Sequence, residues 1–94
     1  MAVSFSLRVL VPSGTLINVT GGESVLLNVN SESYYGLDEV GTRMWAALTT
    51  SQSVQAAYEA LLDEYDVDAE VLRRDLLELI DQFLERGLVE VSNS

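Results

Sequence analysis

The sequence predicts an α+β domain in which a three-stranded antiparallel sheet is followed by three helices. Short β-rich segments separated by turn residues occupy residues 5–37, whereas residues 38–87 carry apolar side chains at helical spacing. With 94 residues the chain suits one hydrophobic core, and its 48% hydrophobic content is too high for a disordered acidic tail. We therefore expect residues 1–94 to form a single domain.

The strands are expected in the first part of the chain. Alternating apolar and polar residues predict a strand over Ser4–Val11, which a Pro-Ser-Gly turn ends. A second β-rich segment covers 16–20 and stops at a Gly-Gly pair. Residues 25–29 and 33–37 then form a predicted hairpin around a polar turn. The pairing of the first strand stays open, because the sequence fits both a separate strand and a loosely held arm.

Three helices are predicted after the strands, each with a polar residue at its N-terminus. Asp38, Ser53 and Asp68 suit these positions, since their side-chain oxygens can accept hydrogen bonds from free backbone N–H groups. The third helix is the longest, and Gly87 suits the left-handed turn that ends many helices. Residues 88–91 predict a short extended tail.

The third helix carries more apolar residues than one core stripe requires. At about 100° per residue, its large apolar side chains span roughly 160° of the helix circumference. Part of this arc could line an exposed groove, or the helix could simply lie at the centre of the core; the spacing fits both. The residues are Leu72, Leu76, Leu77, Leu79, Ile80, Phe83 and Leu84.

Composition excludes several classes of function. Five Arg against fifteen Asp and Glu give a net charge of −10, which repels a nucleic-acid backbone and suits a basic partner. The chain has no His and no Cys, so the usual general base, thiol nucleophile and transition-metal ligands are missing. Four acids at 63–68 lack the Gly and Glu that complete an EF-hand loop. We expect a protein without enzymatic activity, metal or cofactor.

No segment of the sequence predicts a membrane location. A positively charged segment followed by an apolar run does not open the chain, and its apolar runs are far shorter than the roughly 20 residues that cross a bilayer. We therefore expect a cytoplasmic protein.

Residues 25–45 resemble the PqqD-like family. The run VLLNVNSESYYGLDEVGTRMW contains a β-strand, a turn, an aromatic strand and a helix with Gly and Trp, in the order that this family shows. Residues between 54 and 89 are similar to the family's closing helices and its Gly-Leu-Val tail. Asn28 stands where the family often has Asp, and Asp38 stands where it often has Asn.

The resemblance implies a winged-helix-like domain that binds the leader segment of a ribosomally synthesised precursor peptide. Stand-alone members of this size resemble the leader-binding proteins of lasso-peptide biosynthesis, where a separate cysteine-protease leader peptidase removes the leader and an ATP-dependent cyclase closes the ring. The implied partners are therefore the leader, the peptidase and the cyclase, with no nucleic acid and no membrane.

Two alternatives accompany this hypothesis. The same family includes peptide chaperones that serve a radical enzyme in quinone-cofactor biosynthesis, and the neighbouring genes would distinguish the two pathways. The other alternative is a winged-helix DNA-binding regulator. That function requires a basic recognition helix, whereas the longest helix here is acidic.

The predicted leader site lies between the last strand of the sheet and the third helix. An exposed strand edge can bind an extended peptide as a further strand, and Gly36 permits close approach of another backbone. Apolar residues on one margin of the helix would line the other side, with Arg73 or Asp75 orienting a polar leader group. The predicted peptide-binding residues are Ser33, Tyr34, Tyr35, Gly36, Leu37, Leu72, Arg73, Asp75, Leu76 and Leu79.

Overall fold

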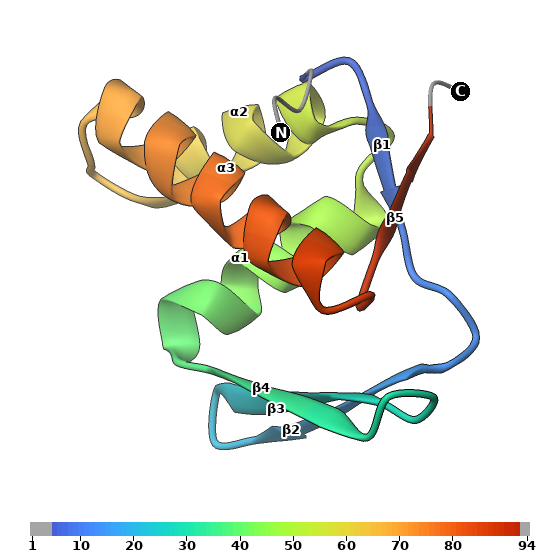
Figure 1. Ribbon diagram of the computed structural model, residues 1–94. Coiled ribbons are helices and arrows are strands. Elements are labelled where there is room, and N and C mark those ends of the chain that lie inside the picture. Colours follow the sequence, from blue (N-terminus) through green and yellow to red (C-terminus); the bar gives the residue numbers. More distant parts are fainter. Residues whose placement is uncertain (1–4, 93–94) are drawn as a thin grey trace.

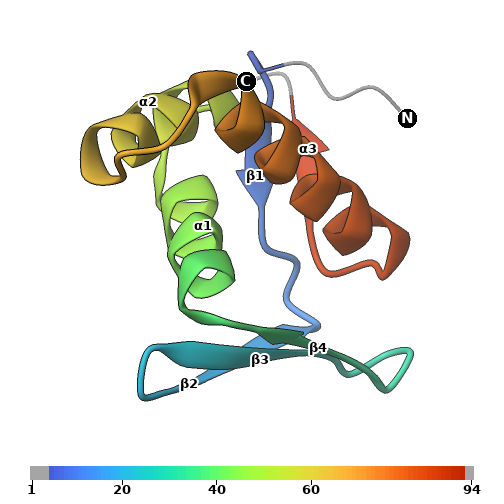
Figure 2. The same ribbon diagram turned by 90° about the vertical axis from the view of Figure 1, so that its left-hand side faces the viewer.

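The computed structural model describes residues 5–92 and contains one three-stranded antiparallel sheet, as predicted. Its strands are β2 (Thr15–Thr20), β3 (Glu23–Asn28) and β4 (Ser33–Leu37), in the order β2-β3-β4. The sheet lies beneath the helices, which are all on one of its sides (Figures 1 and 2). This arrangement confirms the α+β fold class. Ser4, which the sequence assigns to the first strand, lies outside the described residues.

The helices begin at the predicted capping residues. They are α1 (Glu39–Thr50), α2 (Val54–Glu64) and α3 (Ala69–Glu85). The side chains of Asp38, Ser53 and Asp68 each accept a hydrogen bond from a backbone N–H of the first turn, at 2.8, 3.1 and 2.9 Å. Gly87 follows α3 with a φ of +66°, a backbone conformation that glycine adopts without strain. Among residues 5–92, no helix has the length and apolar character needed to cross a membrane.

The strand whose pairing the sequence left open joins the C-terminal tail. β1 (Arg8–Leu10) pairs antiparallel with β5 (Glu90–Ser92) in a separate two-stranded sheet, and the two strands run side by side in Figure 1. The backbone N–H of Val54 also donates to the carbonyl of Leu7 at 2.8 Å, which ties the N-terminal segment to the start of α2. This segment is therefore an integral part of the fold.

One hydrophobic core joins α3 to α1 and to the sheet. The ring of Phe83, which is fully buried, meets Trp45 of α1 edge to face with ring centres 5.1 Å apart. It meets Tyr35 of β4 in the same way at 5.7 Å. These contacts hold α3 beside β4. The buried residues of α3 are Leu72, Leu76, Ile80 and Phe83.

Side-chain hydrogen bonds also fix the end of α3 to the sheet. The amide of Asn28 donates to the carbonyls of Arg86 and Gly87 at 3.0 and 3.2 Å. A carboxylate at this position could not donate these bonds, so the Asn found here in place of the family's frequent Asp has a structural role. The hydroxyl of Thr15 donates to the carbonyl of Leu88 at 2.9 Å.

Candidate functional site

β4 forms one edge of the three-stranded sheet. Within the described part of the chain it pairs only with β3, with Gly36 opposite Val25 and Tyr35 opposite Leu26. Every second residue of such a strand directs its N–H and C=O away from the sheet. The edge of β4 can therefore bind a further strand through its main chain.

A groove of about 490 Å³ lies between β4 and α3, and we call it the β4–α3 groove. Tyr35 lines it from the sheet, and Leu79 is the apolar residue that lines it from the helix. Both side chains are partly exposed, whereas Phe83, which contacts Tyr35 from the core, is fully buried. The lining residues are Tyr35, Asp75, Glu78, Leu79, Asp81, Gln82 and Glu85.

A second hollow of about 350 Å³ adjoins the groove and follows the edge of β4. Tyr35 and Gln82 line both hollows, so the two meet at these side chains. Tyr34, Gly36 and Arg86 complete the second one. The guanidinium of Arg86 lies over the ring of Tyr35 at 4.9 Å, a cation–π contact that fixes both side chains at the end of α3. The two hollows therefore adjoin each other, and the second one follows the edge of β4.

The predicted residues of β4 point to alternate faces of the sheet. Leu37 is buried beneath the helices and Tyr35 packs against Phe83, whereas Tyr34 is 69% exposed on the opposite face. Ser33 is half-buried at the start of the strand. All five residues from 33 to 37 share the unpaired edge, but only Tyr35 adds a side chain to the β4–α3 groove itself.

The predicted residues of α3 separate into three groups. Asp75 and Leu79 line the β4–α3 groove. Leu72 and Leu76 are only 4% and 0% exposed, so the structure places them in the core instead of the groove. Arg73 lies over the ring of Phe5 at 4.3 Å, on the margin of α3 that faces away from β4. Side chains two positions apart on an α-helix point in directions about 160° apart around its axis. Arg73 and Asp75 therefore face different neighbours.

Sequence reasoning missed Glu78, Asp81 and Glu85 of the groove lining. It also missed Gln82 and Arg86, which the structure brings into the site. Both follow Asp75 and Leu79 along one row of the helix at intervals of three and four residues. That spacing would have identified them once the margin facing β4 was known.

The lining of the groove is acidic. Four carboxylates of α3 surround it, against the single guanidinium of Arg86 in the adjoining hollow. This charge suits a ligand with basic side chains. No group of His, Cys, Asp and Glu within residues 5–92 is placed to hold a metal ion. The site combines the free edge of β4, the apolar side chain of Leu79 and the carboxylates of α3. These are features of a peptide-binding surface.

Comparisons with known proteins agree with the fold and size of the chain. The family described as coenzyme PQQ synthesis protein D (PqqD) matches residues 23–89. A solved structure described as TbiB1 in complex with the TbiA(beta) leader peptide is 29% identical, with a TM-score of 0.78 over 85% of this chain and 93% of that chain. Another, lasso peptide synthetase B1 complexed with the leader peptide, shares the fold at 22% identity, with a TM-score of 0.75 over 90% of this chain and 98% of that one. No curated protein sequence matches.

Proposed function

Because the chain belongs to the PqqD family, we propose that it binds the leader segment of a ribosomally synthesised precursor peptide in the β4–α3 groove. The leader adds to β4 as a fourth strand of the sheet and is held on its other side by α3. The observation that carries this proposal is the unpaired edge of β4 beside a groove that α3 lines. The chain then presents the leader to a separate leader peptidase and cyclase of lasso-peptide biosynthesis.

The similar structures support this function and pathway. Both are complexes with leader peptides, and the chain spans nearly their full length. The 29% identity to the first over most of both chains makes a shared ligand class reasonable.

In this proposal the two sides of the groove have different tasks. Main-chain hydrogen bonds to β4 supply affinity for many extended sequences. Leu79 and the ring of Tyr35 form an apolar contact for one leader side chain. Asp75 and its neighbouring carboxylates favour a leader with Lys or Arg nearby, because opposite charges steer and orient a bound peptide.

The family description also favours a second pathway, in which the chain hands a peptide to a radical enzyme of quinone-cofactor biosynthesis. The same groove would serve. A pull-down with the purified enzymes encoded beside this chain's gene separates the two: a leader peptidase and cyclase, or a radical enzyme. DNA binding has no support, because α3 carries five carboxylates against two arginines.

Hydrogen exchange tests strand addition directly. On adding a synthetic leader peptide, the outward-facing amides between Tyr34 and Gly36 should exchange at least tenfold more slowly, because they become hydrogen-bonded to the leader. The amides of β2, at the other edge of the sheet, are the internal control and should not change. Rapid exchange throughout β4 at saturating leader would place the binding site elsewhere.

Leader removal should require the peptidase and should not occur with this chain alone. The purified chain alone should neither cleave nor modify the precursor, since it lacks His and Cys. In the presence of the leader peptidase it should accelerate cleavage by holding the leader near the enzyme. A precursor with a scrambled leader is the control and should show no acceleration. Turnover by the chain alone, in a preparation free of protease, would contradict the proposal.

A further inference from the structure

The two hollows beside β4 differ in charge. Four carboxylates line the β4–α3 groove, and no cationic residue does. The hollow along the edge of β4 has the opposite character, because Arg86 lines it and no carboxylate does. We call it the Arg86 hollow; its other lining residues are Tyr34, Tyr35, Gly36 and Gln82. The positive charge of the site therefore lies directly beside the strand edge.

Arg86 differs from the arginines that are paired within the chain. Arg43 donates to both carboxylate oxygens of Glu64 at 2.7 and 2.9 Å, and Arg74 lies 3.8 Å from Asp75. Among residues 5–92, no carboxylate forms an ion pair with Arg86, and its side chain is exposed. Its N–H donors are therefore available to an anionic group of another molecule.

The ring of Tyr35 holds the guanidinium of Arg86 in place. The guanidinium lies 4.9 Å from the centre of this ring, and the ring itself packs edge to face on the buried Phe83 at 5.7 Å. The main chain is fixed as well, since the carbonyl of Arg86 accepts a hydrogen bond from Asn28 at 3.0 Å. A charged group that is already positioned loses less conformational entropy when it binds a partner.

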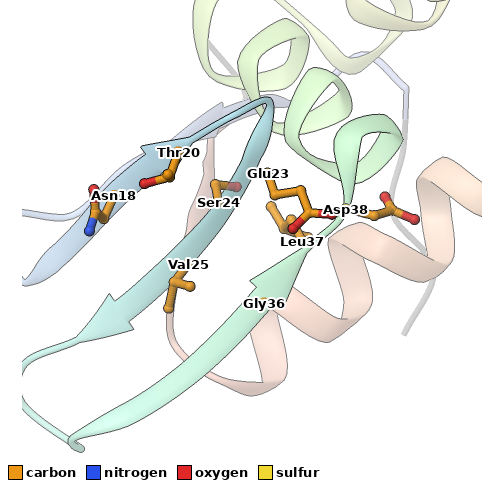
Figure 3. Close-up of a pocket in the computed structure, with 8 residues that line it drawn as sticks. All are labelled: Asn18, Thr20, Glu23, Ser24, Val25, Gly36, Leu37 and Asp38. Carbon is orange, nitrogen blue, oxygen red and sulfur yellow. The ribbon is translucent and has the colours of Figure 1, made fainter.

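A leader strand added to β4 would direct one side chain toward this guanidinium. Tyr35 points to the helix side of the sheet, where it contacts Phe83. Residues directly opposite each other on neighbouring strands share one face, with Cβ atoms about 4.5–5.5 Å apart. The leader residue opposite Tyr35 therefore has Arg86 within reach. Gly36, which Figure 3 shows beside Val25 of β3, adds no side chain that could obstruct the strand.

We propose that Arg86 forms a subsite for an acidic leader side chain, in which the carboxylate of an Asp or Glu binds the guanidinium beside the ring of Tyr35. This inference rests on the proposed function and narrows its ligand. Arginine binds a carboxylate through two parallel N–H···O hydrogen bonds, and the amide of Gln82 can donate a further one. The leader then carries an acidic residue at the strand edge and basic residues toward the carboxylates of α3.

The net charge of −10 is compatible with an acidic subsite. At 0.1 M salt, exposed charges more than about 10 Å apart are largely screened, whereas groups in contact are screened much less. Distant carboxylates therefore act mainly on the rate of association, and Arg86 sets the preference at the leader position that it touches. A leader Lys or Arg at that position is repelled.

The test is a double-mutant cycle between Arg86 and the acidic residues of the leader. The probe is the synthetic leader of the precursor encoded beside this chain's gene. A set of variants replaces one Asp by Asn or one Glu by Gln in each peptide. Isothermal titration gives Kd with the unaltered protein, Arg86→Gln and the matched control Arg73→Gln. Arg73 also lies over an aromatic ring, that of Phe5, but it faces away from β4.

One leader acid should be coupled to Arg86. Neutralising that acid should weaken binding at least fivefold with the unaltered protein and with Arg73→Gln, but less than twofold with Arg86→Gln. The reversed pair is a second measurement. Arg86→Glu should bind the leader that carries Lys at this position at least fivefold more tightly than it binds the unaltered leader.

Three results would overturn the inference. In the first, Arg86→Gln binds every leader as tightly as the unaltered protein does. In the second, it weakens all leaders by the same factor, because Arg86 then only supports Tyr35 or contacts the leader main chain. The third is a leader without Asp or Glu that still depends on Arg86. If the unaltered protein binds no leader at all, the same titration shows that the proposed function itself has failed.

Discussion

Replacing Phe83 with alanine is expected to lower the free energy of unfolding by about 3–5 kcal/mol. The side chain is fully buried, and its ring contacts Trp45 and Tyr35 edge to face. Truncation removes both contacts and leaves a cavity where α1, α3 and β4 meet. Domains of this size are stable by only about 5–15 kcal/mol, so the loss is a large part of the total. Urea denaturation followed by the fluorescence of Trp45 measures it.

The control for this change is Val71→Ala on the same helix. Val71 is 40% exposed, so its truncation should shift the unfolding free energy by no more than about 0.5 kcal/mol. Because Phe83 also supports the ring of Tyr35, the Phe83 variant should bind a leader more weakly even where it remains folded. Equal stability of the Phe83 and Val71 variants would contradict the packing of Phe83 against Trp45 and Tyr35.

Replacing Leu79 with alanine is expected to weaken leader binding by about 1–3 kcal/mol, or roughly 5- to 150-fold in Kd. Leu79 is the apolar residue of α3 that faces Tyr35 across the β4–α3 groove, and it is only partly buried. Truncating Leu79 should therefore remove a binding contact and should lower the free energy of unfolding less than truncating a core residue does. Isothermal titration with a synthetic leader measures the change, after circular dichroism has shown that the variant is folded.

Leu77→Ala provides the matched control for this experiment. Leu77 is the same residue type on the same helix and is also partly exposed, but it lies beside Arg73 and Arg74, away from the groove. It should bind the leader with unchanged affinity. If both variants weaken binding equally, α3 acts through its stability, and the groove is not the binding site.

Leu76 shows how the structure changes an experiment that the sequence suggests. Because the third helix carries more apolar residues than one core stripe requires, the sequence predicts that Leu76 lines the groove. The structure buries Leu76 completely. Leu76→Ala should therefore cost about 2–5 kcal/mol of stability, and any loss of binding would follow from that. Leu79 is the better probe of the site.

Local features of the sequence determined the type and order of most elements. Helical spacing and capping side chains depend only on residues that are close together in the sequence. The structure confirms the helix starts predicted at Asp38, Ser53 and Asp68. The hairpin of β3 and β4 is likewise local, because a short turn joins strands of matching pattern. Such signals act over a few residues, so they can be recognised without knowing the rest of the fold.

Only the tertiary structure decided which distant segments meet. β1 pairs with β5 from the other end of the chain, and neither strand carries a local signal for its partner. Likewise, periodicity defines the positions of Asp75, Leu79 and Arg73 around the axis of one helix. The rotation of α3 against β4 follows from the packing of Phe83 on Tyr35 and Trp45. That rotation directs Leu79 and Asp75 to the groove and Arg73 to Phe5. The physical reason is that helical periodicity defines the angles between side chains of one helix, whereas packing against other elements sets the direction in which each side chain points.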